Sequence, residues 1–221
     1  MSWVSTELYY RHINEKVSTI LGRQHSANLL IDSSDFQPII TLQAAGKWDD
    51  LSALLVDRAH GLKRAGATNF LIASNTMHLC FANIVASVNQ PGLSIFEATT
   101  KRLRDNGIHR VGLLGTRYTM RDPFFIDAYA QGGIAVMVPT APEAARVNEI
   151  IFKELIHNKI NPTSKEYYLA VVHHLAQRGA EAIVLGCTEI GLLLDGHHAS
   201  PPLYDTARIH ADFAVDWLTS T

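Results

Sequence analysis

The chain has 221 residues, of which 47% are hydrophobic and 18% are charged, a composition that allows a substantial core and excludes a disordered chain. Its 19 Lys and Arg residues against 21 Asp and Glu residues give a net charge of −2, which excludes the basic surplus of a dedicated nucleic-acid-binding protein. The sequence has no apolar run of roughly 18 residues, no signal-peptide pattern at its amino end and only two cysteines, which predicts a cytoplasmic α/β protein without a membrane partner.

Strands and helices are predicted to alternate through the first half of the chain, as in a parallel sheet flanked by helices. Ala27–Ile31 is predicted as a strand, and Asp49–Ala65 as an amphipathic helix with Asp49 as its N-cap. The apolar run Phe70–Ile72 is typical of a buried parallel strand. Leu93–Glu97 is the next predicted strand, and the helix after it closes at Gly107.

The second half continues this alternation. Strands are predicted at Arg110–Gly115, Ile134–Val138 and Leu203–Asp205, and helices at Pro142–His157, Lys165–Gln177 and Thr206–Leu218. We therefore expect an α/β fold of two pseudo-symmetric lobes, each a parallel sheet flanked by helices, with the active site in the cleft between them. Residues 1–97 and 206–221 are assigned to the first lobe, and residues 98–205 to the second.

The two halves contain an internal repeat with a period of 113 residues. Residues 66–77 align without gaps over residues 179–190, and each copy runs from a helix-ending glycine through a short apolar strand into a polar triplet. The triplets are Ser74-Asn75-Thr76 and Cys187-Thr188-Glu189. A strand ending at Gly115 precedes the second copy, and its counterpart would precede Met1. Either the first lobe is built without that strand, or the sequence begins late.

Ser74 and Cys187 hold the same position in the two copies, at the carboxyl end of a strand and directly before a helix. Ligands bind at this edge of open α/β sheets, and the positive end of a helix dipole favours a reactive thiolate. If the lobes face each other about a pseudo-twofold axis, the two side chains flank one ligand, which suits removal of a proton from a carbon and its return on the other face. The alternative for Cys187 alone is a buried core cysteine, the role predicted for Cys80.

The segment Ser74–His78 resembles the first active-site motif of the aspartate/glutamate racemase superfamily, usually Cys-Asn-Thr, and Gly186–Glu189 resembles the second. The resemblance covers essentially the whole chain, with further matches at Met1–Trp3, Tyr9-Tyr10, Asp35-Phe36, Gly115–Met120 and Asp205-Thr206. The nearest branch is the amino-acid racemases that work without pyridoxal phosphate on aspartate, glutamate or a broader set. The resemblance implies a two-lobed homodimer, a small amino-acid substrate, no cofactor, and two opposed cysteines as acid and base.

Two departures from the family pattern bear on activity. Serine stands at position 74, and its hydroxyl is too weak an acid to supply a base at neutral pH without a partner. We therefore expect weak, direction-biased turnover or none, with Cys187 as the competent thiol. His78, one helical turn further on, is a candidate partner base, against a core or capping role. Family members also begin with a strand and a Gly-Gly turn before the Met-Ser segment, and this piece is expected to be missing.

Asn75, Thr76 and Thr188, with the backbone N–H groups beside them, are candidates for holding a substrate carboxylate. Plain N-capping is the alternative for the same residue types. The resemblance also places Glu189, Met1 and Ser2 at the substrate.

Five further residues are candidates from the second-half loop and two helices. Thr116, Tyr118 and Thr119 follow the strand that ends at Gly115, and no phosphate-loop pattern is present there. Arg146 is positioned to neutralise a side-chain carboxylate, or lies on the surface as a solvated arginine. Gln43 either reaches the substrate from the first lobe or lies on a helix surface.

Amino-acid racemisation is the first function hypothesis, and two alternatives stay open. One is a single-thiol decarboxylase or cis–trans isomerase of dicarboxylates from the same superfamily, and the other is a truncated paralogue that binds an acidic amino acid without turnover. The 11 histidines include the pairs His173-His174 and His197-His198, but no metal-binding spacing, so surface histidines and no metal site are expected.

Overall fold

The computed structural model describes residues 2–22, 24–194 and 200–220, and these form two compact units. Unit 1 comprises Met1–Ser94 with His210–Thr221, and unit 2 comprises Ile95–Ile209. The two units are described separately below.

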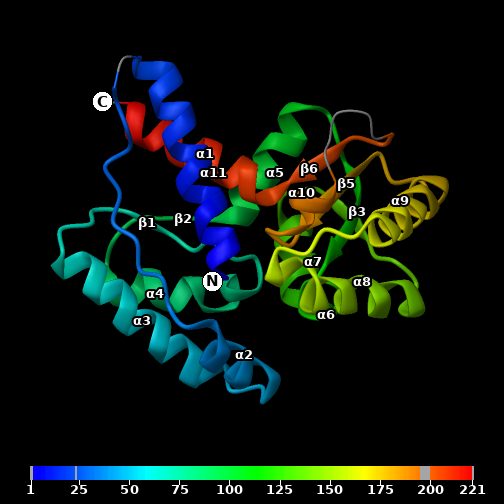
Figure 1. Ribbon diagram of the computed structural model, residues 1–221, viewed down its shortest axis with the longest axis horizontal. Helices are drawn as coiled ribbons and strands as arrows, with labels where there is room; N and C mark the ends of the chain where they lie inside the picture. Colours follow the sequence, from blue (N-terminus) through cyan, green and yellow to red (C-terminus); the bar gives the residue numbers. More distant parts are fainter. Residues whose placement is uncertain (1, 23, 195–199, 221) are drawn as a thin grey trace. The chain divides into compact units, whose positions relative to one another are not determined.

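Unit 1 contains a two-stranded parallel sheet among helices (Figure 1). Its strands β1 (Phe70–Leu71) and β2 (Gly92–Leu93) pair with Phe70 opposite Gly92. The helices are α1 (Trp3–Leu21), α2 (Phe36–Ala44), α3 (Trp48–Arg64), the 3₁₀ helix η1 (Thr76–Cys80), α4 (Phe81–Val88) and most of α11 (Thr206–Thr219). Figure 1 shows α1 and α11 on one side of the two strands and α3 and α4 on the other.

Unit 2 contains a four-stranded parallel sheet in the order β4-β3-β5-β6. The strands are β3 (Arg110–Gly115), β4 (Ala135–Met137), β5 (Ala182–Gly186) and β6 (Leu203–Asp205). The helices are α5 (Ile95–Asp105), α6 (Arg117–Arg121), α7 (Pro123–Gln131), α8 (Ala141–Lys153), the 3₁₀ helix η2 (Leu155–His157), α9 (Pro162–Gln177) and α10 (Ile190–Leu193). The predicted α/β class with two parallel sheets flanked by helices is confirmed.

The central strands of unit 2, β3 and β5, are buried except at Arg110, the first residue of β3. All five residues of β5 are buried, as are the last five of β3. Glycine permits the tightest contact, since a Cβ on Gly112 would lie 2.7 Å from Cδ1 of Ile183 and 2.9 Å from Cδ1 of Leu175. This close packing holds the carboxyl ends of β3 and β5 side by side. The candidate residues of unit 2 directly follow these two strand ends.

Three local predictions in unit 1 and at its border are wrong. Ala27–Ile31 forms no regular strand, since it has no paired neighbour on the side of β1. The strand predicted at Leu93–Glu97 stops at Leu93, and Glu97 lies in the first turn of α5. Asp49 is not an N-cap, because α3 already begins at Trp48 and Asp49 lies in its first turn, where a negative charge favours the helix dipole.

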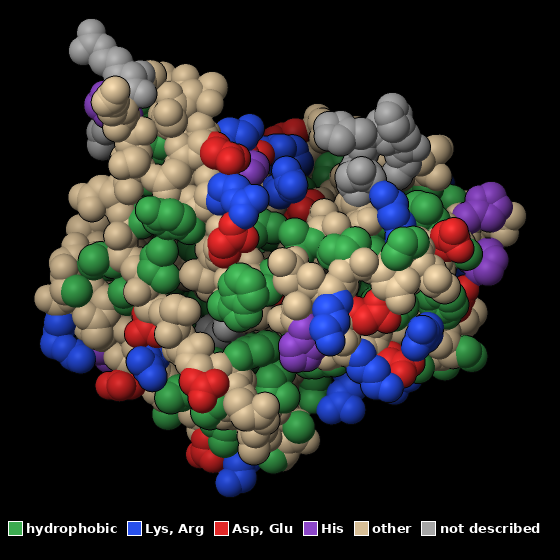
Figure 2. All heavy atoms as spheres, in the orientation of Figure 1, with side chains coloured by type: hydrophobic (Ala, Val, Ile, Leu, Met, Phe, Trp, Pro, Cys, Tyr) green, Lys and Arg blue, Asp and Glu red, His purple; other side chains and the backbone are tan. Residues whose placement is uncertain are grey.

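None of the described helices is long and apolar enough to cross a membrane. On the face drawn in Figure 2, Lys and Arg side chains are interspersed with Asp and Glu, in keeping with the small net charge of −2.

Candidate active site in two sequence-related halves

The half of the site in unit 2 lies where two neighbouring parallel strands end. Gly115 of β3 stands opposite Gly186 of β5, so Thr116 and Cys187 leave the sheet at the same level. A Cβ on Gly115 would lie 3.0 Å from the carbonyl oxygen of Gly186, so the two glycines permit the strands to approach closely here. This edge of a parallel sheet is where ligands bind in open α/β folds.

Cys187 is hydrogen-bonded to a carboxylate two residues further along the chain. Its Sγ donates to Oε2 of Glu189 at 3.0 Å, and the Thr188 hydroxyl donates to the same oxygen at 2.8 Å. All three side chains are buried, with 7% exposure at Cys187 and 4% at each of the other two. The second triplet is therefore one hydrogen-bonded group around a carboxylate.

The thiol of Cys187 is held in its protonated form. Burial raises its pKa well above the ordinary value, and the charge and hydrogen bond of Glu189 raise it further, as does Asp205. The expectation of a thiolate stabilised by a helix dipole is therefore wrong for this structure. The helix that follows Cys187, α10, has only four residues. Among the described contacts, the charged group nearest to Sγ of Cys187 is the Glu189 carboxylate, which is negative.

Replacing Glu189 by glutamine is expected to lower the pKa of the Cys187 thiol toward its ordinary value, because a negative charge and its hydrogen bond would be removed. The rate of alkylation by iodoacetamide, measured against pH in a Cys80→Ala background, should shift to lower pH. Glu149→Gln, on an exposed turn of α8, is the matched control and should leave the profile unchanged. A profile that stays in place in Glu189→Gln would contradict the assigned contact.

Thr116 and Thr119 form a second hydroxyl pair in this half-site. Thr116 is the N-cap of α6, its Oγ1 lies 3.0 Å from Oγ1 of Thr119, and both residues are buried. Tyr118 lies between them in sequence and is half-buried, and its hydroxyl accepts a hydrogen bond from Arg117 at 2.6 Å. The structure thus places the loop residues Thr116, Tyr118 and Thr119 in the same unit as Cys187, at the end of the adjacent strand.

Asp205 lies at the end of β6. Its Oδ1 accepts from the backbone N–H groups of Ala207 and Arg208 at 2.9 and 3.3 Å, so it caps α11. Leu185 of β5 pairs with Asp205, and the carboxylate contributes to the raised pKa of Cys187. In the sequence, this electrostatic role could be inferred only from a carboxylate at the end of a predicted strand. The internal repeat alone does not identify Asp205.

The candidate residues of unit 1 are organised around Ser74. Ser74 is half-buried, and its Oγ accepts a hydrogen bond from the backbone N–H of Met77 at 3.4 Å, in the first turn of η1, whose N-cap residue is Asn75. Asn75 and Thr76 follow at 3% and 6% exposure, and Asn75 makes no side-chain capping hydrogen bond. The structure therefore does not support the capping alternative for the side chain of Asn75.

His78 belongs to the core. Its side chain is 1% exposed, and its Nδ1 donates to the carbonyl oxygen of Ser74 at 2.7 Å, so this nitrogen is not available to the Ser74 hydroxyl. Burial lowers the pKa of His78 to about 4. Of the two alternatives for His78, the structure supports the core hydrogen bond. Cys80 is also a core residue, as predicted.

The three remaining candidate residues of the first lobe are Ser2, Gln43 and Met1. Ser2 is buried as the N-cap of α1, and its neighbour Ser5 donates through Oγ to the carbonyl of Ala73 at 2.9 Å, one residue before Ser74. Gln43 is 5% exposed on α2, so the helix-surface alternative is wrong for it. Met1 lies outside the described residues.

Arg146 is an exposed residue of α8 whose Nη1 contacts Oε2 of Glu149 at 2.6 Å. That hydrogen bond raises the pKa of the Arg146 guanidinium. Of the two alternatives for Arg146, its exposed position agrees with the surface arginine. Within the described ranges, no group of three or more His, Cys, Asp and Glu side chains is placed to hold a metal ion. His197 and His198 lie outside those ranges.

The family model for Asp/Glu/hydantoin racemases matches residues 1–214 of this chain. A crystal structure of a candidate Asp/Glu racemase from Yersinia pestis is 41% identical, has a TM-score of 0.90, and matches over 98% of this chain and 95% of that one. An aspartate racemase homologue from Pyrococcus horikoshii OT3 is 31% identical, with a TM-score of 0.83 over 97% of this chain and 94% of its own.

The aspartate racemase of Picrophilus torridus is 18% identical, with a TM-score of 0.74 over 98% of this chain and 89% of its own, a likeness that shows the fold.

Proposed function

The chain belongs to the Asp/Glu/hydantoin racemase family, and we propose that it racemises a small amino acid by proton removal and return at the α-carbon, with Cys187 as its competent thiol. The observation that carries this proposal is the buried contact between Sγ of Cys187 and the Glu189 carboxylate at the end of β5. Few structural roles require a thiol, a hydroxyl and a carboxylate in one hydrogen-bonded group at a ligand-binding edge.

Cys187 acts first as a proton donor in this proposal. Its raised pKa keeps the proton on sulfur until the Cα–H bond on the other face of the substrate has broken, with the α-proton passing by way of the Ser74 hydroxyl to solvent water, and a carbanion remains at the α-carbon. The Sγ–H bond then breaks as the Cα–H bond forms, and the electron pair remains on sulfur as a thiolate. Because the raised pKa makes this thiolate a strong base, the same group removes an α-proton in the opposite direction.

The hydroxyl groups beside Cys187 are proposed to orient the substrate. Thr116 and Thr119 leave the adjacent strand at the same level and are buried, so their hydroxyls are fixed before a substrate binds. Thr188 holds the Glu189 carboxylate in position and thereby orients the thiol. In the other copy of the repeat, Asn75 and Thr76 are proposed as ligands of the substrate carboxylate.

Ser74 is proposed to exchange the second proton, at a lower rate than Cys187. A serine hydroxyl is a much weaker acid than a thiol, and the Nδ1 of His78 is already bonded to a backbone carbonyl. Without a pre-formed base at Ser74, proton exchange on its face of the α-carbon is slow. Exchange of the α-proton with solvent is therefore expected to be faster for the enantiomer whose α-proton Cys187 removes, whereas Ser74 limits racemisation in both directions.

Replacing Cys187 by alanine is expected to lower racemisation by about 100-fold or more, since a positioned acid–base group would be lost. Each enantiomer of aspartate and of glutamate is incubated with the protein, and the product is measured by chiral chromatography. Cys80→Ala is the matched control, because Cys80 is the chain's other cysteine and lies in the unit 1 core. Equal losses in the two variants would contradict the role of Cys187.

A decarboxylase is the second candidate function, and the protonated state of Cys187 is the observation that favours it. A decarboxylase needs only a proton donor on one face of a carbanion, which a thiol with a raised pKa supplies. Release of carbon dioxide from a disubstituted malonate, without exchange of any amino-acid α-proton, would support this function over racemisation.

A further inference from the structure

The end of β6 packs directly against the short helix that follows Cys187. The carboxylate of Asp205 is turned toward Gly191 of α10, where a Cβ would lie 3.0 Å from Cγ of Asp205 and closer still to its Oδ2. The Asp205 side chain is only 12% exposed, so it has little room to move aside. A side chain at position 191 would therefore collide with this carboxylate, and glycine leaves the space that the carboxylate occupies.

The Asp205 carboxylate is held in place by the start of α11. Its Oδ1 accepts from the backbone N–H groups of Ala207 and Arg208 at 2.9 and 3.3 Å, and its Oδ2 lies 3.4 Å from Nε of Arg208. The carboxylate cannot turn away from α10 without giving up the cap of α11, which would cost about 1 kcal/mol. It is therefore a fixed neighbour of Gly191.

The segment 187–192 forms two tight turns that bring the Glu189 carboxylate back to the thiol. The N–H of Ile190 donates to the carbonyl of Cys187, and the N–H of Leu192 donates to the carbonyl of Glu189, each at 3.1 Å. Glu189 has the helical backbone angles φ −91° and ψ −14°, and its Oε2 accepts from Sγ of Cys187 at 3.0 Å. The contact between carboxylate and thiol therefore depends on the course of the backbone through these turns.

The junction of β6 and α11 holds this segment at both ends. Leu185 of β5 pairs with Asp205, and its carbonyl accepts from the Thr206 hydroxyl at 2.8 Å. At the other end of the segment, Gly191 lies against the Asp205 carboxylate. A shift at either end would therefore have to displace the junction itself.

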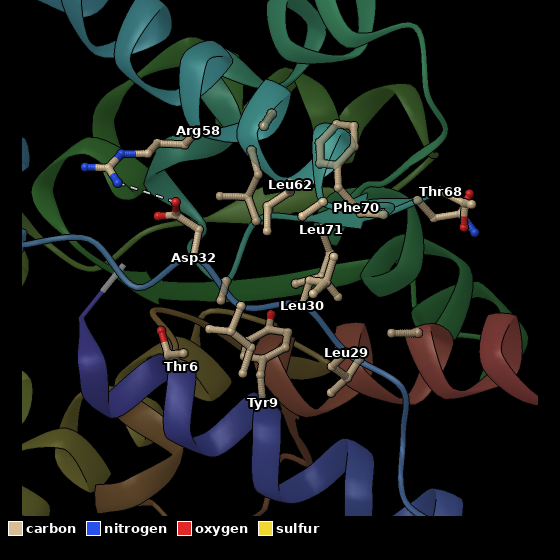
Figure 3. A pocket seen from close by; sticks show the side chains of 18 of the residues that line it. Thr6, Tyr9, Leu29, Leu30, Asp32, Arg58, Leu62, Thr68, Phe70 and Leu71 are labelled. Carbon is tan, nitrogen blue, oxygen red and sulfur yellow. Dashed lines mark hydrogen bonds and ion pairs between the residues drawn. The ribbon is translucent and has the colours of Figure 1, made fainter.

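The first copy of the repeat is built differently at the corresponding places. Gly191 aligns with His78 at the period of 113 residues, so unit 1 has a large buried side chain at the position that glycine leaves open in unit 2. Among the described strands, β1 pairs with β2 alone, and it borders an apolar cavity of about 490 Å³ that the segment 28–32 also lines (Figure 3). β5 is paired on both edges, with β3 and with β6. The packing of a carboxylate on a glycine is thus found in the copy that carries Cys187.

We propose that Asp205 is a positioning residue for Cys187, because its carboxylate, packed on Gly191, holds the segment 187–192 in the course that keeps Glu189 on the thiol. This role rests on the proposed function, in which Cys187 is the thiol that transfers the proton. Asp205 acts through Glu189 and also through its own negative charge.

The state of the thiol reports on this geometry. Glu189 and Asp205 of β6 both raise the pKa of Cys187, in addition to burial. Tyr168 of α9 also acts on this thiol, and it stays protonated because burial raises its own pKa well above the ordinary value. Loss of the Glu189 contact should therefore lower the pKa of Cys187 even when no charge has been removed from the chain.

The test adds a Cβ at position 191 and follows the thiol. In a Cys80→Ala background, alkylation by iodoacetamide is measured against pH for Gly191→Ala, which leaves every charge in place. The midpoint is expected to fall by about one pH unit, which makes alkylation about tenfold faster at pH values below the midpoint. The physical reason is that the Cβ displaces either α10 or the Asp205 carboxylate, so that Glu189 leaves the thiol.

A double-mutant cycle shows whether the shift comes from this one contact. Asp205→Ser removes the carboxylate that the Cβ would meet and keeps a side-chain oxygen to cap α11. When Asp205→Ser is already present, Gly191→Ala should bring no further shift of the midpoint. Gly61→Ala is the matched control in both backgrounds, because a Cβ at this position of α3 would meet only Nη2 of Arg64, at 3.9 Å, and it should leave the midpoint unchanged.

If Gly191→Ala does not fold, Asp205→Glu produces the same overlap from the other side with the charge kept, and the same fall of the midpoint is expected. An unchanged midpoint in the folded variant overturns the proposal. An equal shift by Gly191→Ala with and without Asp205→Ser also overturns it. Alkylation needs no turnover, so a protein that racemises no amino acid would refute the proposed function, while the midpoints would still decide the positioning role of Asp205.

Discussion

Replacing Ser74 by cysteine is expected to accelerate racemisation from either enantiomer by about 100-fold or more. A thiol with an ordinary pKa near ~8.5 ionises far more readily than a serine hydroxyl, so the variant would carry a competent acid–base group in both copies of the repeat. The site accepts the change, since Ser74 is half-buried and its Oγ makes only a long contact with the N–H of Met77. Initial rates from each pure enantiomer, measured by chiral chromatography, give the two directions separately.

Ser94→Cys is the matched control for this gain. Ser94 is also buried and follows the neighbouring strand β2, but it is not the residue that the repeat aligns with Cys187. It should leave both rates unchanged. If Ser74→Cys brings no gain, or if Ser94→Cys brings an equal one, position 74 is not the second proton-exchange position.

Unit 1 is expected to lose stability steeply as the pH falls below about 6.5, because it buries two neutral histidines. Burial lowers the pKa of His78 to about 4, and burial together with His78 lowers the pKa of His210 to about 3. The His210 ring is held by the Tyr9 hydroxyl at Nδ1, at 2.8 Å, and by the carbonyl of Leu93 at Nε2, at 2.9 Å. Both rings are thus fixed as neutral groups in the folded chain.

The sign of this effect follows from proton uptake. Between pH 6.5 and about 4, the unfolded chain binds two protons at these histidines that the folded chain does not bind, so the free energy of unfolding falls as the pH falls. Two such protons give a slope approaching about 2.7 kcal/mol per pH unit. The stabilisation is complete above pH 6.5. Urea denaturation at a series of pH values measures the slope.

His210→Gln should reduce this slope by the contribution of one proton, which is about half of the total. The matched control is His109→Gln, since His109 is an exposed residue of unit 2. A slope that is the same in the unmodified protein and in His210→Gln would show that the buried ring does not account for the acid sensitivity.

The strands with the strongest sequence signal were predicted with their observed bounds. Arg110–Gly115 and Leu203–Asp205 are strands as predicted. Arg110–Gly115 is a largely apolar run that pairs with a neighbouring strand on each edge, and Leu203–Asp205 pairs with β5. Ala27–Ile31 has a comparable composition but forms no strand. Regular strand structure depends on a paired neighbour as well as on local sequence, and this segment borders a cavity.

For the candidate site, too, one part could be predicted from the sequence and another part could not. The repeat identified Ser74 and Cys187 and the polar residues after them, since strand ends and spacing are visible in a sequence. It did not reveal that the Glu189 side chain turns back to Sγ of Cys187, which reverses the expected protonation state of the thiol. The short length of α10 and the burial of Gln43 likewise follow from tertiary packing.

Deuterium exchange at the α-carbon is the most direct measurement of whether one thiol carries the proton transfer. The unmodified protein is incubated in deuterated water with L- or D-glutamate, and with L- or D-aspartate, and the α-proton signal is followed by nuclear magnetic resonance. Faster loss of the signal from one enantiomer, and no loss from that enantiomer in Cys187→Ala, is the result that our account predicts. Equal exchange from both enantiomers, or exchange from the faster enantiomer that persists in Cys187→Ala, would contradict it.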